Sequence, residues 1–130
     1  MEIYLGQKAE AIRKFDKQAV LDFATLTGDF NPVHFDEAYA ANTIFKKPIV
    51  HGPLVLTLVT TLFANELPGS GSVYLSHDVQ YKLPVYYDDV ITARLEVIEI
   101  SSKNHVFLST ICYNQEGNIV MTGVARLKKY

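Results

Sequence analysis

The sequence predicts an α+β fold in which a mainly antiparallel sheet covers one buried helix. Three features predict it: helical spacing of apolar residues in the first third, an uncharged apolar stretch at residues 54–64, and alternation with period 2 after residue 72. Of the 130 residues, 48% are apolar and 20% are charged, which is ordinary for a compact domain. We therefore expect one domain over residues 1–130.

The chain is expected to begin with a strand at residues 8–15, followed by a helix at residues 16–27. Asp16 can cap the start of this helix, and Gly28 can end it in a left-handed conformation. Four apolar residues recur in it at helical spacing: Ala19, Val20, Phe23 and Ala24. A second helix is predicted from residue 36 to about residue 45, because this stretch is rich in alanine and starts with two acids.

The third helix should begin near Gly52 and Pro53, because proline at a first helical position loses no hydrogen bond. Its apolar residues are expected to cover every side: Leu54, Val55, Leu56, Leu58, Val59, Leu62 and Phe63. Such a helix must be enclosed. The sheet can cover most of it, and the flank that remains predicts a dimer with two-fold symmetry.

After residue 72 the apolar residues alternate with polar ones, as in a half-buried antiparallel strand: Val73, Leu75, Val79, Tyr81 and Leu83. The same alternation over residues 91–97 predicts the next strand. Its apolar phase then slips at Ile98 and Ile100, which indicates a β-bulge.

The end of the chain predicts a β-hairpin. Residues 101–104 form a turn, and residues 105–113 and 119–127 are two strands joined by turn-forming residues at 114–118. The sheet is therefore expected to be built mainly from the second half of the chain.

Charge and cysteine content exclude several classes of function. The 12 basic and 14 acidic residues are spread without a basic run, so neither nucleic-acid binding nor a basic membrane-binding helix is expected. The single cysteine, Cys112, cannot form an internal disulfide and lies in a predicted buried strand. A reducing cytoplasm is the expected location.

Neither export nor membrane insertion is expected from the apolar segments. Residues 1–10 lack the long apolar centre of a signal peptide and are expected to be part of the mature protein. Residues 54–64 are apolar but far shorter than the roughly 20 residues needed to cross a bilayer.

Two stretches concentrate residues capable of chemistry: Thr27-Gly28-Asp29-Phe30-Asn31-Pro32-Val33-His34 and Pro48-Ile49-Val50-His51-Gly52-Pro53. Asp29 and His34 are five positions apart, and Pro32 forces a non-helical backbone between them. They can therefore bend toward one point. Taken singly, Asp29 is typical of a turn acid and His34 of a loop histidine, but together a carboxylate and an imidazole are an adequate acid–base pair.

These two stretches resemble the signature of the MaoC-like dehydratases, and specifically of the (R)-specific enoyl-CoA hydratases, whose fold is the hot-dog. The similarity extends over nearly the whole chain, including the predicted central helix and Tyr81-Lys82-Leu83-Pro84-Val85. It implies an antiparallel β-sheet wrapped around a long central helix, with a helical overhang before it. The implied reaction is reversible hydration of trans-2-enoyl-CoA to (R)-3-hydroxyacyl-CoA without a cofactor.

The resemblance also implies roles for individual residues. Asp29 and His34 would hold and activate the water, while the Gly52 amide at the start of the buried helix would bind the thioester oxyanion. Asn31 would shape the loop by bonding its own backbone. Thr60 stands where the family has a serine, so its role as an orienting hydroxyl is open.

The substrate-binding parts are less defined. Leu54, Leu58 and Leu62 are candidate walls for the acyl chain, together with Val73 and Leu75, although core packing explains most such residues equally well. Four cations are available for the CoA phosphates: Lys46, Lys47, Lys82 and Arg126. An acyl-carrier-protein substrate in place of CoA stays open.

Three alternatives remain at this point. A thioesterase of the same fold also needs an oxyanion donor and a carboxylate. A metal site could use Asp29, His34, His51 and Asp36, although no usual ligand spacing is present, so we expect none. A catalytically silent acyl-binding module would keep the pair as loop architecture only. His51 itself is either a structural or a dimer-interface histidine.

Overall fold

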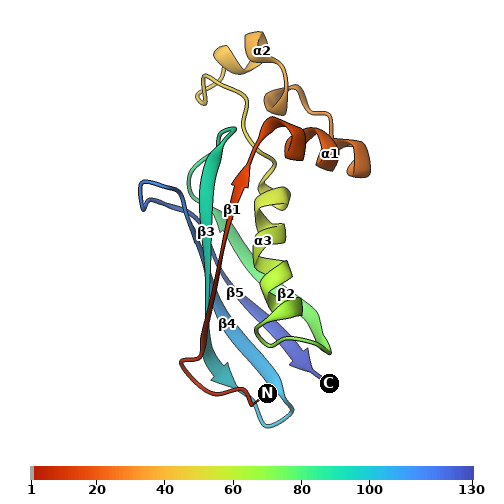
Figure 1. The fold of residues 1–130 in the computed structure, drawn as a ribbon, viewed down its shortest axis with the longest axis vertical. Helices are drawn as coiled ribbons and strands as arrows, with labels where there is room; N and C mark the ends of the chain where they lie inside the picture. Colours follow the sequence, from red (N-terminus) through yellow and green to blue (C-terminus); the bar gives the residue numbers. More distant parts are fainter. Residues whose placement is uncertain (1) are drawn as a thin grey trace.

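The computed structural model describes residues 2–130, so of the N-terminal segment considered above only Met1 lies outside the described residues. It confirms the α+β class and the hot-dog arrangement, with helix α3 lying along one face of a five-stranded antiparallel sheet (Figure 1). The sheet order is β1-β3-β4-β5-β2. The elements are β1 (Lys8–Phe15), α1 (Lys17–Thr27), the 3₁₀ turn η1 (Pro32–His34), α2 (Glu37–Ala41), α3 (Gly52–Asn65), β2 (Ser72–Tyr81), β3 (Asp89–Ile100), β4 (His105–Tyr113) and β5 (Ile119–Lys129).

Helix α3 supplies the centre of the hydrophobic core. Six of its side chains are buried, facing the sheet and its covering segments: Leu54, Val55, Leu58, Val59, Leu62 and Phe63. Leu56 is only half-buried, and Thr57, Thr60 and Thr61 lie on less buried positions. The prediction that the helix is apolar on every side is therefore wrong for this flank, where hydroxyls bond the helix's own carbonyls.

The first helix forms as its caps predict. The Asp16 carboxylate accepts a hydrogen bond from the Ala19 amide at 2.9 Å. At the other end Gly28 has φ 84°, and its N–H donates to the Ala24 carbonyl at 2.7 Å. Figure 1 shows α1 and α2 beyond the sheet, at the end where α3 begins and opposite both termini. They form the predicted overhang.

The second helix is shorter than predicted and ends before residue 42, not near residue 45. The Asn42 side chain donates to the Ala38 carbonyl at 3.1 Å, and the Thr43 hydroxyl donates to the Ala40 carbonyl at 2.7 Å. Such side-chain bonds compete with the helical ladder. Lys46, with φ 66°, then turns the chain back toward α3.

The sheet follows the predicted pattern except at its β2 edge. In β3 the pairing register shifts between Val97 and Glu99, which confirms the bulge. In β2, however, Val73, Leu75 and Tyr81 are 45%, 41% and 50% exposed, so the predicted half-buried face is open along this edge. A register shift between Tyr74 and Ser76 further disrupts the alternation.

None of the helices within residues 2–130 combines the length and the hydropathy that crossing a bilayer requires.

Candidate functional site

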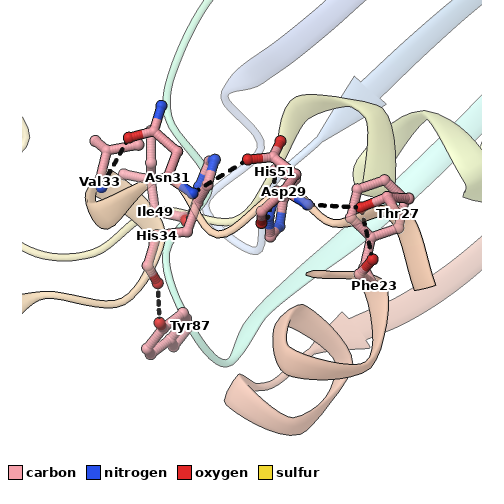
Figure 2. Close-up of polar contacts among 9 residues, drawn as sticks. All are labelled: Phe23, Thr27, Asp29, Asn31, Val33, His34, Ile49, His51 and Tyr87. Atoms are coloured by element: carbon pink, nitrogen blue, oxygen red, sulfur yellow. Dashed lines mark hydrogen bonds and ion pairs between the residues drawn. The ribbon is translucent and has the colours of Figure 1, made fainter. Parts of the chain in front are cut away.

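Local hydrogen bonds in the loop after α1 fix the position of Asp29. The Thr27 hydroxyl donates to the Phe23 carbonyl at 2.8 Å and accepts from the Asp29 amide at 3.3 Å (Figure 2). The Asp29 carboxylate in turn accepts from the Asn31 amide at 3.3 Å. Its side chain remains 46% exposed.

Asn31 caps the short turn that carries His34. Its side-chain oxygen accepts from the Val33 amide at 3.2 Å, and Pro32 starts the 3₁₀ turn at a position that needs no donor. The predicted bonding of Asn31 to its own backbone is therefore present. This turn reverses the chain between Asp29 and His34.

His34 is 8% exposed, and both its side chain and its main chain make hydrogen bonds. Its Nδ1 lies 2.8 Å from the Ile49 carbonyl, and its own carbonyl accepts a hydrogen bond from the Tyr87 hydroxyl. A carbonyl can only accept, so Nδ1 carries the proton and the neutral ring keeps a free lone pair on Nε2.

Burial is the main cause that lowers the pKa of His34 below its ordinary value. The Ile49 carbonyl and the Asp29 carboxylate act in the opposite direction, while His51 lowers the pKa further. The lowered pKa keeps more of the imidazole neutral near neutral pH. His34 is thus able to take up a proton at Nε2.

His51 joins this cluster; the sequence had grouped it with Asp29 and His34 only as a possible metal ligand. Its ring stacks on the His34 ring with centroids 3.7 Å apart, and its Nε2 lies 3.0 Å from the Asp29 carbonyl. A carboxylate oxygen of Asp29 and one ring nitrogen each of His34 and His51 all lie within 4.8 Å of one another. A water between the carboxylate and the imidazole can therefore reach both.

Gly52 is the first residue of α3, so its N–H has no acceptor within the helix. It lines a cavity of about 420 Å³ that His34 also lines. Most of the other walls are apolar: Phe45, Val55, Leu83, Val85, Val120 and Met121. A Cβ atom at Gly52 would lie 2.8 Å from the Tyr81 ring, so glycine permits this approach.

The other predicted residues lie elsewhere. Leu54, Leu58 and Leu62 pack in the core and do not line this cavity, so their role as acyl walls stays a prediction. Thr60 lies eight residues beyond Gly52, about 12 Å along the helix axis. Its hydroxyl donates to the Thr57 carbonyl at 3.2 Å.

The four candidate cations are distributed over three cavities. Lys82 lines the cavity beside His34, whereas Lys46 and Lys47 line a neighbouring one of about 350 Å³ with Tyr86 and Tyr87. Arg126 lines a third, with Ser76 and Asp78.

Of the four residues predicted as possible metal ligands, only Asp29, His34 and His51 lie together. The Asp36 carboxylate instead caps α2 by accepting a hydrogen bond from the Tyr39 amide. The nitrogens His34 Nδ1 and His51 Nε2 carry protons toward carbonyls. A metal needs deprotonated nitrogens, and the remaining one of His51 is buried. The donor set therefore fits acid–base chemistry better than metal binding.

Comparison with known proteins gives consistent matches over almost the whole chain. The sequence model of the family described as MaoC like domain matches residues 4–118. The (R)-specific enoyl-CoA hydratase of Aeromonas caviae is 42% identical over 125 residues, which cover 95% of this chain and 93% of that protein. The enzyme of the same name from Rhodospirillum rubrum is 33% identical, over 95% of this chain and 86% of its own length.

Solved structures agree with these matches. The (R)-hydratase from A. caviae involved in PHA biosynthesis superposes with a TM-score of 0.93 at 41% identity, covering 98% of both chains. The R-hydratase PhaJ1 from Pseudomonas aeruginosa superposes with a TM-score of 0.91 at 39% identity, over 99% of this chain and 84% of that one.

Proposed function

The chain belongs to the MaoC-like domain family, and from this premise we propose that it is an (R)-specific enoyl-CoA hydratase. The reaction is the reversible addition of water to trans-2-enoyl-CoA, giving (R)-3-hydroxyacyl-CoA. The product and its stereochemistry follow from the names of the relatives from A. caviae and R. rubrum. The observation that carries the mechanism is the grouping of Asp29 and His34 next to Gly52.

In this mechanism Asp29 and His34 hold one water between them. His34 Nε2 takes a proton from the water as its oxygen bonds to carbon 3 of the enoyl chain. The electron pair of the double bond moves to the thioester carbonyl as an enolate. Carbon 2 then takes a proton from the same pair, so both residues end in their starting protonation states.

The enolate oxygen is stabilised by the Gly52 N–H, at the positive end of α3. Pro53 follows and has no N–H, so it adds no second donor. The thioester carbonyl would thus lie at the cavity wall formed by Gly52, with the alkene directed toward His34. Asn31 and Thr60 have supporting roles in this proposal.

We assign the acyl chain to the apolar cavity of about 420 Å³. A CoA thioester is the expected substrate. An acyl-carrier-protein thioester is a second candidate, because the 3-hydroxyacyl-[acyl-carrier-protein] dehydratase FERN of Solanum lycopersicum is 36% identical over 93% of this chain.

The proposed assembly is a homodimer formed along β2. This strand ends the sheet order, and its exposed Val73, Leu75 and Tyr81 would be covered there. The expected location is the cytoplasm, since the single cysteine, Cys112, cannot form an internal disulfide.

The test follows the ultraviolet absorbance of the conjugated thioester in crotonyl-CoA, with free thiol release measured in parallel. Loss of absorbance without thiol supports hydration, whereas thiol release would indicate a thioesterase. Absence of both would support a silent acyl-binding module. Asp29→Asn and His34→Ala should each lower the rate by about 10²- to 10⁴-fold.

Matched controls keep this test specific. Asp22→Asn changes an exposed carboxylate of α1, and His105→Ala changes a half-buried histidine at the start of β4. Both should retain the wild-type rate. If Asp29→Asn or His34→Ala hydrates crotonyl-CoA normally, the assigned roles are wrong.

A further inference from the structure

Three parts of the proposed site adjoin His51, two through its ring and one through its main chain. Its Nε2 lies 3.0 Å from the Asp29 main-chain carbonyl, although the two residues are 22 positions apart. Its ring stacks on the His34 ring at a centroid distance of 3.7 Å and an interplanar angle of 27°. Its own carboxyl side is peptide-bonded to Gly52, at the start of α3.

The His51 side chain has no freedom to reach a substrate. It is 0% exposed, and two aromatic rings pack against it: the Phe23 centroid lies 4.9 Å away and the Phe35 centroid 6.0 Å away. His51 also does not line the cavity that contains Gly52 and His34. Any effect of His51 on the reaction must therefore act through its neighbours.

The hydrogen bonding of His51 argues against a purely space-filling role. Because the Asp29 carbonyl only accepts, Nε2 carries the proton, and Nδ1 is buried without a hydrogen-bond partner among the described residues. A buried polar atom without a partner destabilises the fold, because it loses its hydrogen bonds to water and gains none in return. An apolar ring would avoid this cost, so retention of an imidazole points to its other contacts.

We propose that His51 is a positioning residue, which ties the Asp29 backbone and the His34 ring together so that carboxylate and Nε2 face the same water. This inference rests on the proposed hydratase function. Its physical basis is that a fixed geometry of reacting groups lowers the barrier, and a displacement of about 1 Å can cost about 10²-fold in rate.

The same contacts also act on the pKa of His34. The charged and titratable groups that act on His34 are Asp29, which raises its pKa, and His51, which lowers it. The Tyr87 hydroxyl contacts only the His34 main chain. Removal of the His51 imidazole should therefore raise the pKa of His34 and move the acid side of the activity profile to higher pH.

The experiment separates the two contacts of His51 by substitution. His51→Phe keeps an aromatic ring against His34 but removes the donor to Asp29. His51→Gln keeps an N–H that reaches as far as Nε2 but removes the ring. Val97→Ala, at a residue 1% exposed in β3, is the control for lost stability away from the cluster.

The steady-state rates on crotonyl-CoA and the thermal melting points of all four proteins are compared. We expect His51→Phe to lower kcat by about 10- to 100-fold with KM almost unchanged. The kcat of His51→Gln should be about fivefold higher than that of His51→Phe, because Gln restores one hydrogen bond to Asp29. Val97→Ala should melt earlier but retain kcat.

A second measurement does not depend on catalysis or on the melting point. Histidine-labelled protein is titrated by NMR, and the His34 signal is assigned from its loss in His34→Asn. We expect the His34 midpoint to rise in His51→Gln while the His105 signal is unchanged. If the NMR spectrum shows that one His51 variant is unfolded, that variant is set aside, and the other His51 variant tests the proposal.

The outcomes are distinct for the two hypotheses. If the wild-type protein does not hydrate crotonyl-CoA, the proposed function fails, whatever the His51 variants do. If the wild type is active but His51→Phe and His51→Gln keep its kcat and its His34 midpoint, only the role of His51 is overturned. A loss of kcat equal to that in Val97→Ala would also overturn it.

Discussion

The His34 ring donates from Nδ1 to the main-chain carbonyl of Ile49 at 2.8 Å. This bond fixes the tautomer of the neutral imidazole and leaves Nε2 with a free lone pair. It also joins the loop after α1 to the segment that leads into α3.

The first prediction concerns pH. His34 must be unprotonated to accept a proton, and burial lowers its pKa below the ordinary value of 6.5. The acid side of the kcat/KM profile should therefore have its midpoint below pH 6.5, with activity rising as pH increases through that midpoint. In Asp29→Asn, loss of the carboxylate should move the NMR midpoint of His34 lower still. A midpoint that rises in this variant would contradict the assigned contact.

The second prediction compares two glycines with the same backbone conformation. Gly28 has φ 84° and Gly117 has φ 80°, and a Cβ at either position would meet no atom within 4 Å. Alanine should therefore destabilise each by about 1–2 kcal/mol through backbone strain alone. Only Gly28→Ala should also lower kcat, because it precedes Asp29. Equal kcat values in the two variants would show that the α1 cap does not position the carboxylate.

The third prediction concerns the close approach of Tyr81 to Gly52, the proposed oxyanion-binding residue. In Gly52→Ala the added methyl group would lie 2.8 Å from Tyr81 Cε1, so the ring or the start of α3 must move. We expect kcat to fall by about 10²-fold, because the Gly52 amide moves with the helix end. Adding Tyr81→Val removes the ring and should restore part of the rate. A double variant as slow as Gly52→Ala would locate the damage elsewhere than in this clash.

The fourth prediction tests the hydroxyl of Thr60. Thr60→Val keeps the shape of the side chain but removes the hydrogen bond to the Thr57 carbonyl. If the hydroxyl supports catalysis, Thr60→Val should lower kcat by about 10-fold while Thr60→Ser retains it. Thr61→Val is the control, since the exposed Thr61 makes the same kind of bond to the same carbonyl. An equal rate in all variants would remove Thr60 from the supporting residues.

Local sequence signals predicted the elements that depend on local bonds. Asp16, Gly28 and Asn31 each bond a residue no more than four positions away, so their types and spacing were sufficient. The second helix ended early because the side chains of Asn42 and Thr43 turn back onto its carbonyls. Composition alone does not decide that competition.

Long-range contacts were beyond the sequence pattern. His51 meets Asp29 across 22 positions, and nothing in its immediate surroundings distinguishes that contact from a structural or interface position. Similarly, the apolar residues of α3 follow one pattern, which cannot separate Leu58, a core residue away from the cavity, from Val55, a core residue that also lines it. That distinction depends on where β5 and the loop after β2 pass.

The Asp29 side chain is 46% exposed, whereas His34 is 8% exposed and faces the apolar cavity. Bulk solvent therefore reaches the pair from the carboxylate, whereas an acyl chain bound as proposed would reach it from the side of the imidazole. In the proposed hydration, the water consumed in each turnover would be resupplied through this exposed side while the acyl chain still occupies the cavity. The two reactants need not compete for one entrance.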